Sequence, residues 1–281
     1  MAIHPTAIVE PGARIHASAD IGPFCVIGPK VTIGPGTKLL QGVTVLGRTT
    51  IGARNLIHPT AVIGGDPQDL KFKGEDTITV IGDENVIREG VTINKGTVSG
   101  GGQTVIGSRN LIMAIVHVAH DCIVEDNTIL ANAVFLAGHV RIESSAILSG
   151  WVVIHHFVTV GQGAFIGGAS RVGQDVCPYM LLQGLGGEIR GINSVGLRRR
   201  GIKPDAINAL REAYRLIWRS GLPKPEALAE VEKMFGPYPE IKTILEFLRA
   251  ADQGHMGRRR EPRRAPPPPS APAPESEEDL E

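Results

Sequence analysis

The stretch ILANAVFLAGHVRIESSAILSGWVVIHHFVTVGQGAFIGGASRV (129–172) carries an aliphatic residue at every sixth position. These residues are Leu130, Leu136, Ile142, Leu148, Ile154, Val160, Ile166 and Val172. The position four residues after each one is small or β-branched, as at Val134, Ala146 and Ser170, which suits a crowded interior. Hexads of this kind are typical of parallel β-helices, in which three sides of six residues make one triangular coil.

The same period extends in both directions from this stretch. A first block of hexads covers Val9 to Ile63, and a second covers residues 81–93. The third begins at Ile106 and includes the stretch quoted above, and the pattern ends after Val176. Two segments, 64–80 and 99–105, interrupt the pattern, and we expect both to be loops thrown out of a coil. The sequence therefore predicts a parallel β-helix of hexapeptide repeats over residues 1–185.

The C-terminal part changes its period. From Pro204 to Asp252 the apolar residues follow helical spacing, with Ile207, Leu210 and Ala213 on one stripe. We expect an α-helical domain over residues 186–253. Residues 254–281 are basic, then proline-rich, then acidic, so they cannot bury a core and are predicted to form a disordered tail.

Composition narrows the classes of partner. The 29 basic and 29 acidic residues balance, so nucleic acid is not expected to be a partner. The longest apolar runs fall short of the ~20 residues that a membrane span needs, and the N-terminus does not resemble a secretory signal. Three scattered cysteines form no disulfide framework. A cytoplasmic protein fits these features best.

Histidines gather at one predicted edge of the prism, outside the inward positions. His120 and His139 are 19 residues apart, one coil plus one, and His155 follows His120 by 35, two coils minus one. His120 is followed directly by Asp121. An adjacent carboxylate can orient an imidazole and stabilise its cation, as a general base requires. The pattern favours an active site over a purely structural solenoid.

Zinc is the rival explanation for clustered histidines. His117 and His120 would point to different faces of an extended strand, although neighbouring subunits could supply other ligands. We therefore expect no metal and no cofactor. Cys25 and Cys122 fall in inward positions and are interpreted as packing residues.

Several motifs in order resemble the UDP-N-acetylglucosamine 3-O-acyltransferase family. They are QDLKFKGE (68–75), IREGVTINKGT (87–97), AHDC (119–122), LAGHV (136–140), GQDVCPY (173–179) and GLRRRG (196–201), and the likeness covers residues 2–250. The resemblance implies an all-β left-handed parallel β-helix with a C-terminal α-helical domain, assembled as a homotrimer with active sites between subunits. It also implies transfer of a 3-hydroxyacyl chain from acyl carrier protein to the glucosamine 3-hydroxyl of UDP-N-acetylglucosamine, the first step of lipid A biosynthesis.

The resemblance assigns roles to individual residues. His120 matches the general base, Asp121 its orienting partner, Gly138 the backbone donor to the oxyanion, and His139 a residue that positions the substrates. Gly168 matches the floor of the acyl groove, so its missing side chain predicts a long donor such as hydroxymyristoyl, unless this glycine only serves a turn. Substrate contacts are implied for Gln68, Asp69, Lys71, His117, His155, His156, Asn193, Arg199 and Arg200.

Two positions depart from the family pattern. Relatives often have glutamine where His156 stands and a carboxylate where Val195 stands, which bears on the affinity for the nucleotide. Two other reactions stay open: N-acylation of a 3-amino analogue of the sugar nucleotide, and transfer of acetyl from acetyl-CoA by a related hexapeptide enzyme. The latter would not be expected to carry the QDLK loop or the helical C-terminal part.

Overall fold

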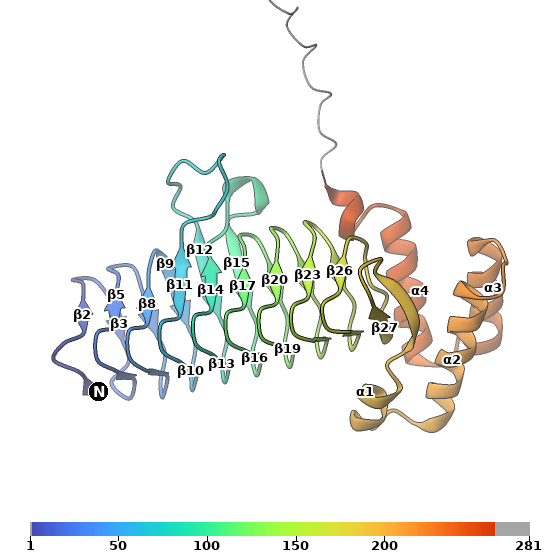
Figure 1. Ribbon diagram of the computed structural model, residues 1–281, viewed down its shortest axis with the longest axis horizontal. Helices are drawn as coiled ribbons and strands as arrows, with labels where there is room; N and C mark the ends of the chain where they lie inside the picture. The colour runs from blue at the N-terminus through green and yellow to red at the C-terminus, as the bar shows by residue number, and fades with distance from the viewer. Residues whose placement is uncertain (1, 262–281) are drawn as a thin grey trace, which may run out of the picture.

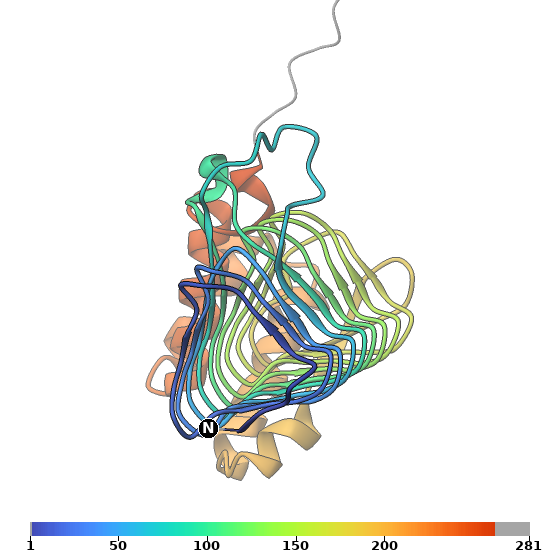
Figure 2. The ribbon, with the colours of Figure 1, turned by 90° about the vertical axis from the view of Figure 1, so that its left-hand side faces the viewer.

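The computed structural model describes residues 2–261 and shows a prism of short strands with a helical part at one end (Figure 1). Viewed along the prism, the coils have a triangular outline (Figure 2). The predicted fold class, a left-handed parallel β-helix with C-terminal helices, is confirmed. None of the helices in the described part is long and apolar enough to cross a membrane.

Each side of the triangle is one sheet. Sheet A contains β1 (Ala2–Ile3), β4 (Asp20–Ile21), β7 (Lys38–Leu39), β10 (Leu56–Ile57), β13 (Val86–Ile87), β16 (Leu111–Ile112), β19 (Ile129–Leu130), β22 (Ile147–Leu148), β25 (Phe165–Ile166), β27 (Met180–Gln183) and β28 (Glu188–Ile192). Sheet B contains β2 (Ile8–Val9), β5 (Val26–Ile27), β8 (Thr44–Val45), β11 (Val62–Gly65), β14 (Thr92–Asn94), β17 (His117–Val118), β20 (Phe135–Leu136), β23 (Val153–Ile154) and β26 (Arg171–Val172). Sheet C contains β3 (Arg14–Ile15), β6 (Thr32–Ile33), β9 (Arg48–Ile51), β12 (Ile78–Ile81), β15 (Gln103–Ile106), β18 (Ile123–Val124), β21 (Arg141–Ile142) and β24 (Thr159–Val160).

The hexad explains this geometry. In most two-residue strands the second residue is the aliphatic one and points inward, as Leu130 and Leu148 do at 0% exposure. Parallel pairing stacks equivalent positions of successive coils, for example Leu130 on Leu148. Fully burying one such side chain contributes roughly 1.5–3 kcal/mol, so the repeated column supplies most of the stabilisation of the prism.

A column of polar residues enters the core at the corner between sheets C and A. Thr37, Asn55, Asn85, Asn110 and Thr128 stack there, and all five are buried. The side-chain oxygen of each of the first four accepts the backbone N–H of the next, over 2.7–3.1 Å. These bonds satisfy most of the polar groups that burial would otherwise leave unpaired.

Both predicted loops leave from the corner between sheets B and C. One connects Gly65 to Ile78, and the other contains the 3₁₀ helix η1 (Val98–Gly100). Figures 1 and 2 show the two loops projecting side by side from this edge of the prism. The turns 119–122 and 137–140 follow at the same corner on the next coils.

The helical part packs on the last coils through an antiparallel pair, β27 with β28. Its helices are α1 (Ser194–Arg199), α2 (Pro204–Trp218), α3 (Lys224–Phe235) and α4 (Pro239–Asp252). The predicted stripe of α2 is buried in a second core, with Leu210 and Ala213 at 0% exposure.

The first residues of the predicted tail take a defined path. Residues 254–261 turn back from α4 and include the 3₁₀ helix η2 (Gly257–Arg260). This differs from the expectation of a disordered tail from residue 254 onward, because Gly257 is buried against the last coils. The remainder of that predicted tail, 262–281, lies outside the described residues.

Candidate active site

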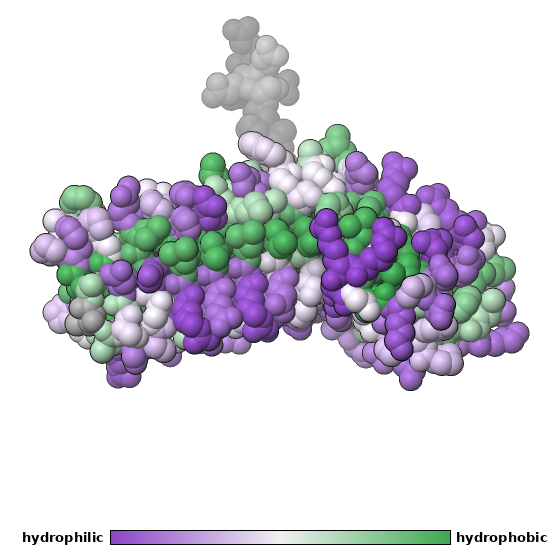
Figure 3. Space-filling model, turned by 90° about the horizontal axis from the view of Figure 1, so that it is seen from below, coloured by the Kyte–Doolittle hydropathy of each residue, from purple (hydrophilic) through white to green (hydrophobic). Residues whose placement is uncertain are grey.

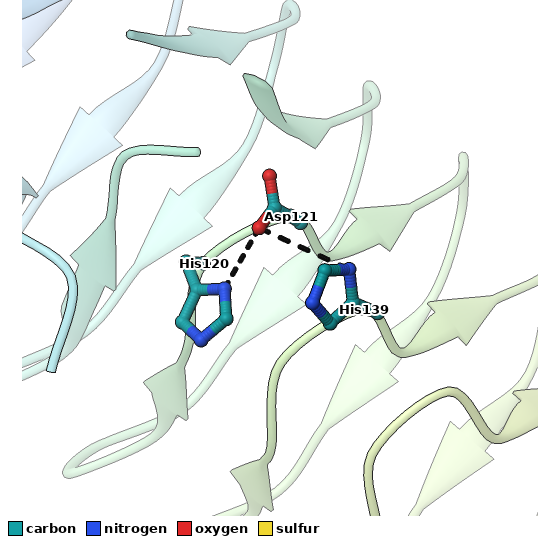
Figure 4. A group of neighbouring side chains, drawn as sticks. All are labelled: His120, Asp121 and His139. Atoms are coloured by element: carbon teal, nitrogen blue, oxygen red, sulfur yellow. Dashed lines mark hydrogen bonds and ion pairs between the residues drawn. The ribbon is translucent and has the colours of Figure 1, made fainter. Parts of the chain in front are cut away.

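His120 and Asp121 lie in the turn between β17 and β18, at the corner between sheets B and C. His120 Nδ1 is 2.7 Å from Asp121 Oδ2, and Figure 4 shows the ring held edge-on to the carboxylate. The chain turns here because Asp121 adopts a left-handed backbone conformation, with φ of 60°. With Nδ1 bonded to the carboxylate, Nε2 is the nitrogen left to exchange a proton with a substrate.

The Asp121 carboxylate is held by a residue of the η1 loop. Thr97 donates its N–H to Oδ1 at 2.8 Å and its hydroxyl to Oδ2 at 2.6 Å. Burial opposes ionisation of Asp121, but the hydrogen bonds from His120 and Thr97 outweigh it and lower the pKa of this carboxyl. Asp121 is therefore an anion at neutral pH, fixed in place to stabilise an imidazolium.

Two glycines leave room for this pair. A Cβ on Gly138 would lie 2.6 Å from Cε1 and 2.8 Å from Nε2 of His120, which is closer than atoms approach. A Cβ on Gly100 would overlap the Asp121 carboxylate. The histidine ring and the carboxylate are thus packed directly against backbone, and His120, although it points away from the prism axis as expected, is only 8% exposed.

His139 lies one coil further along the same corner. Its ring meets that of His120 edge-on with centroids 5.2 Å apart, and its Nδ1 is 3.9 Å from Asp121 Oδ2. The opposite face stacks on Phe157 at 4.3 Å. Burial lowers the pKa of His139 despite the nearby Asp121 anion, so the ring is neutral at neutral pH. The predicted neighbourhood of the two histidines is present.

His117 projects from β17 on the face of sheet B. Its Nδ1 is 2.8 Å from the Thr92 hydroxyl on the preceding coil. Burial first, and then the neighbouring His120, lower the pKa of His117. A neutral imidazole with one nitrogen bonded to a hydroxyl can offer the other to a polar ligand.

The side chains of His120, Asp121 and His139 are close enough together to bind one metal ion. Ligand atoms of His120, Asp121 and His139 all lie within 4.8 Å of one another. However, both oxygens of Asp121 already accept hydrogen bonds, from Thr97 and from His120. Binding a cation through this carboxylate would break those bonds, so the donor set fits proton transfer better than metal binding.

His155 and His156 occupy the following turn of the same corner, with ring centroids 5.3 Å apart. The His155 Nδ1 lies 2.9 Å from Nη1 of Arg258, which comes from η2. Burial and the neighbouring His155 lower the pKa of His156. The expected column of histidines along one edge is present, but its outer end is in contact with the C-terminal segment.

Asn193, Arg199 and Arg200 lie elsewhere. Asn193 caps α1 by accepting the Gly196 N–H at 3.0 Å, and its amide donates to the Gly163 carbonyl at 3.0 Å, at the corner between sheets C and A. Asn193, Arg199 and Arg200 together line a cavity of about 490 Å³. Its other lining residues are Asn127, Ile129, Ser145, Ile147, Phe165, Leu181, Ile192, Ser194, Val195 and Gly196. In Figure 1, α1 lies on the edge of the molecule opposite the loops. One chain therefore does not bring these residues to His120.

The remaining predicted residues lie at two corners of the prism. Gln68 and Lys71 are exposed in the loop between β11 and β12, where the Lys71 N–H donates to Asp69. Gly168 is exposed at the corner between sheets A and B, and its φ is not positive. The left-handed residue of that turn is Ala169, so the turn does not require glycine at 168.

Known proteins match the chain over most of its length. A family model described as UDP N-acetylglucosamine O-acyltransferase, domain 2, matches residues 175–256, and one described as GMPPB C-terminal domain matches residues 3–104. Acyl-[acyl-carrier-protein]–UDP-N-acetylglucosamine O-acyltransferases from Burkholderia lata and Anaeromyxobacter sp. are 52% and 49% identical to the chain. Each match covers 90% of the chain and 98% or 99% of the relative. The chain belongs to this acyltransferase family.

A solved UDP-N-acetylglucosamine O-acyltransferase from Moraxella catarrhalis superposes with a TM-score of 0.86, at 44% identity, covering 89% of this chain and 97% of that one. The domain 2 model of the acyltransferase family includes α1 to α4 and ends at residue 256. It thus contains Asn193, Arg199 and Arg200, and it stops just before η2.

The residues that sequence reasoning missed come mainly from the loop between β14 and β15. Thr97, Gly100 and Thr104 hold the Asp121 carboxylate or its backbone, with Thr104 accepting the Asp121 N–H at 2.8 Å. Only a weak signal pointed to them, namely the glycine run that interrupts the hexads at 100–102.

Proposed function

We propose that the chain transfers a 3-hydroxyacyl chain from acyl carrier protein to the 3-hydroxyl of UDP-N-acetylglucosamine, the first step of lipid A biosynthesis, in the cytoplasm. The observation that carries the mechanism is the anchored pair at the corner of sheets B and C: His120, oriented through Nδ1 by a carboxylate that Thr97 holds. The family membership of the chain supports the substrates.

His120 acts as the general base. Its Nε2 removes the proton from the sugar 3-hydroxyl as the oxygen attacks the thioester carbonyl, and the adjacent Asp121 anion stabilises the imidazolium that forms. When the tetrahedral intermediate collapses, the C–S bond breaks and the imidazolium returns the proton to the thiolate of the carrier. The histidine is thereby regenerated without a cofactor.

Gly138 supplies the donor for the oxyanion. Its N–H has no acceptor among residues 2–261, in contrast to the N–H of His139, which is bonded to the His120 carbonyl at 3.1 Å. An unused backbone donor beside the base can stabilise charge that develops on the thioester oxygen. The close contact between Gly138 and the His120 ring places this donor within the same small volume.

A homotrimer completes the site in this proposal. The catalytic pair and the α1 cavity lie at different corners of one prism, so a second copy must bring its α1 to the histidines of the first. Sheet A also turns partly exposed apolar residues outward, including Leu111, Ile129 and Ile147. Figure 3 shows apolar side chains gathered in a stripe along the side of the prism that is seen from below. A continuous apolar stripe is typical of a surface that another molecule covers.

The α1 cavity holds the nucleotide in this assembly. Arg199 and Arg200 suit a diphosphate because guanidinium groups pair with phosphate oxygens in a forked geometry. Val195, which is 50% exposed at the cavity wall, offers no acceptor for a ribose or uracil group. Within one chain we assign residues 1–185 to the catalytic prism and 186–253 to the helical domain that carries the nucleotide residues.

Mass spectrometry of the products tests this function directly. The protein is incubated with UDP-N-acetylglucosamine and either 3-hydroxyacyl carrier protein or acetyl-CoA, and then with the 3-amino analogue of the sugar nucleotide. We expect an O-acylated product only from the carrier protein and the hydroxyl sugar. An acetylated product, or an amide formed in preference to the ester, would refute the proposed pairing of substrates.

A further inference from the structure

The segment Gly257–Glu261 lies beyond the residues that the family model matches, yet it packs on the active-site corner. Its anchor is Asp175, whose carboxylate accepts the Arg258 N–H at 3.1 and 3.2 Å and the Thr159 N–H at 2.8 Å. Gly257 has a φ of 69°, and a Cβ on it would overlap the Asp175 carboxylate. The attachment is therefore specific to a glycine at this position.

Arg258 crosses the outer end of the histidine column. All of its side-chain hydrogen bonds within residues 2–261 come from Nη1, which contacts His155 Nδ1 at 2.9 Å, the His156 carbonyl at 3.1 Å, and Glu261. Its buried Nε has no acceptor among those residues. The Nε edge of the Arg258 guanidinium is thus free of hydrogen bonds within these residues, and the Glu261 carboxylate of the same segment is bonded to Nη1.

Arg260 lies one coil closer to the catalytic pair. Its guanidinium carbon is 5.8 Å from the centre of the Phe157 ring, and Nη2 donates to the His139 carbonyl at 3.4 Å. Among residues 2–261 it has no carboxylate partner. Asp175 acts on Arg260 only through space, without an ion pair, so this guanidinium, set against an aromatic ring that also stacks on His139, places a positive charge beside His139.

Arg259, between these two, points away. It contacts Asp252, and its side chain is 61% exposed. The segment therefore directs two arginines toward the active-site corner and one toward α4, which provides a matched control.

We propose that Arg258 and Arg260 form a phosphate-binding wall beside the His120–Asp121 pair, which holds a phosphate group of a bound substrate. The proposal rests on the proposed function, in which both substrates carry phosphate: the diphosphate of the sugar nucleotide and the phosphodiester of the arm of the carrier protein. Forked guanidinium donors match phosphate oxygens, and Glu261 occupies Arg258 as an internal anion until a substrate displaces it.

Steady-state kinetics on purified full-length variants tests this wall. For Arg258→Ala and Arg260→Ala we expect the KM for one of the two substrates to rise about 10-fold or more while kcat changes by less than about 3-fold, as uniform binding loss predicts. A rise in the KM for UDP-N-acetylglucosamine identifies the diphosphate as the ligand, and a rise for acyl carrier protein identifies the phosphodiester. Arg259→Ala should leave both constants unchanged.

Two further variants separate binding from folding. Gly257→Val dislodges the segment without removing an arginine and should raise the same KM, with an unchanged melting temperature of the prism. Glu261→Gln removes the internal anion and should lower that KM.

Unchanged KM values in an active Arg258→Ala, Arg260→Ala double variant would overturn the wall, as would a loss confined to kcat. Truncation after Met256 that raises turnover would identify an inhibitory segment instead and would also overturn it. A wild-type protein that fails to acylate UDP-N-acetylglucosamine at all would count against the proposed function, and not against the wall alone.

Discussion

The histidine corner and the α1 cavity differ in almost every respect. The corner is small, buried and polar, and the His120–Asp121 pair packs against the backbone of two glycines. The cavity is about 490 Å³, mostly apolar, and edged by two arginines. Yet both belong to one chain, at different corners of the same prism. In the proposed assembly, this chain carries the reacting groups and the nucleotide-binding groups as two half-sites, which a second copy of the chain brings together.

The largest expected effect is at the corner. His120→Ala removes the proposed general base and should lower kcat about 10²–10⁴-fold. The KM values should change little, because the proposed nucleotide-binding residues lie at another corner of the prism. Turnover and the melting temperature are measured together, since His120 is only 8% exposed and its loss leaves a small cavity. Near-normal turnover in a folded variant would remove His120 from the mechanism.

Mixing the two half-sites gives the next largest effect. His120→Ala and Arg200→Ala chains are each nearly inactive alone, but random co-assembly into trimers should restore about a quarter of the wild-type sites. Activity is measured after the two proteins are unfolded and refolded together, with each refolded alone as the control. If no activity returns in confirmed mixed trimers, the two half-sites act within one chain.

Loosening the support of the base should cost less than removing it. Asp121→Asn keeps the shape of the side chain but removes the charge that stabilises the imidazolium. Its kcat should therefore remain about 10- to 100-fold above that of His120→Ala. Thr97→Val, which deletes one hydrogen bond to the same carboxylate, should have a smaller effect again. The reverse order of these two variants would show that the Thr97 hydroxyl acts on substrate directly.

The smallest effect concerns preference among donors. Gly168 is exposed, a Cβ there would lie 3.3 Å from the Gly150 carbonyl oxygen, and the turn does not require glycine. Gly168→Met should therefore fold and prefer a donor several carbons shorter, since each methylene that no longer fits forfeits about 0.8 kcal/mol of burial. Competition between long and short 3-hydroxyacyl carrier proteins measures this ratio. An unchanged preference would show that Gly168 does not border the acyl groove.

The periodic part of the molecule could be predicted from the sequence, because one rule places every residue. The 19-residue spacing put His120 and His139 on neighbouring coils, and their rings are in contact. The rule says nothing where the period breaks. Thr97 lies in the loop between β14 and β15, so its contact with Asp121 depends on the path of that loop, which local spacing does not encode.

The C-terminal segment shows the same limit. Its composition predicted disorder, because a short charged stretch cannot bury a core of its own. It takes a defined path because the Arg258 N–H and Gly257 both contact the half-buried carboxylate of Asp175 on the last coils. A tertiary contact of this kind has no local signature, so only the structure reveals it.

The column of buried amides at the corner of sheets C and A also fixes how successive coils align with one another. Its members Asn55, Asn85 and Asn110 are 30 and 25 residues apart, whereas uninterrupted coils repeat every 18, as from Asn110 to Thr128. The column thus runs through the two coils that carry the long loops, on the side away from them. A coil that slipped by one hexad would leave these amides facing apolar neighbours without partners, which is costly. Loops at the corner between sheets B and C can therefore change in length and sequence while the prism beneath them keeps its alignment.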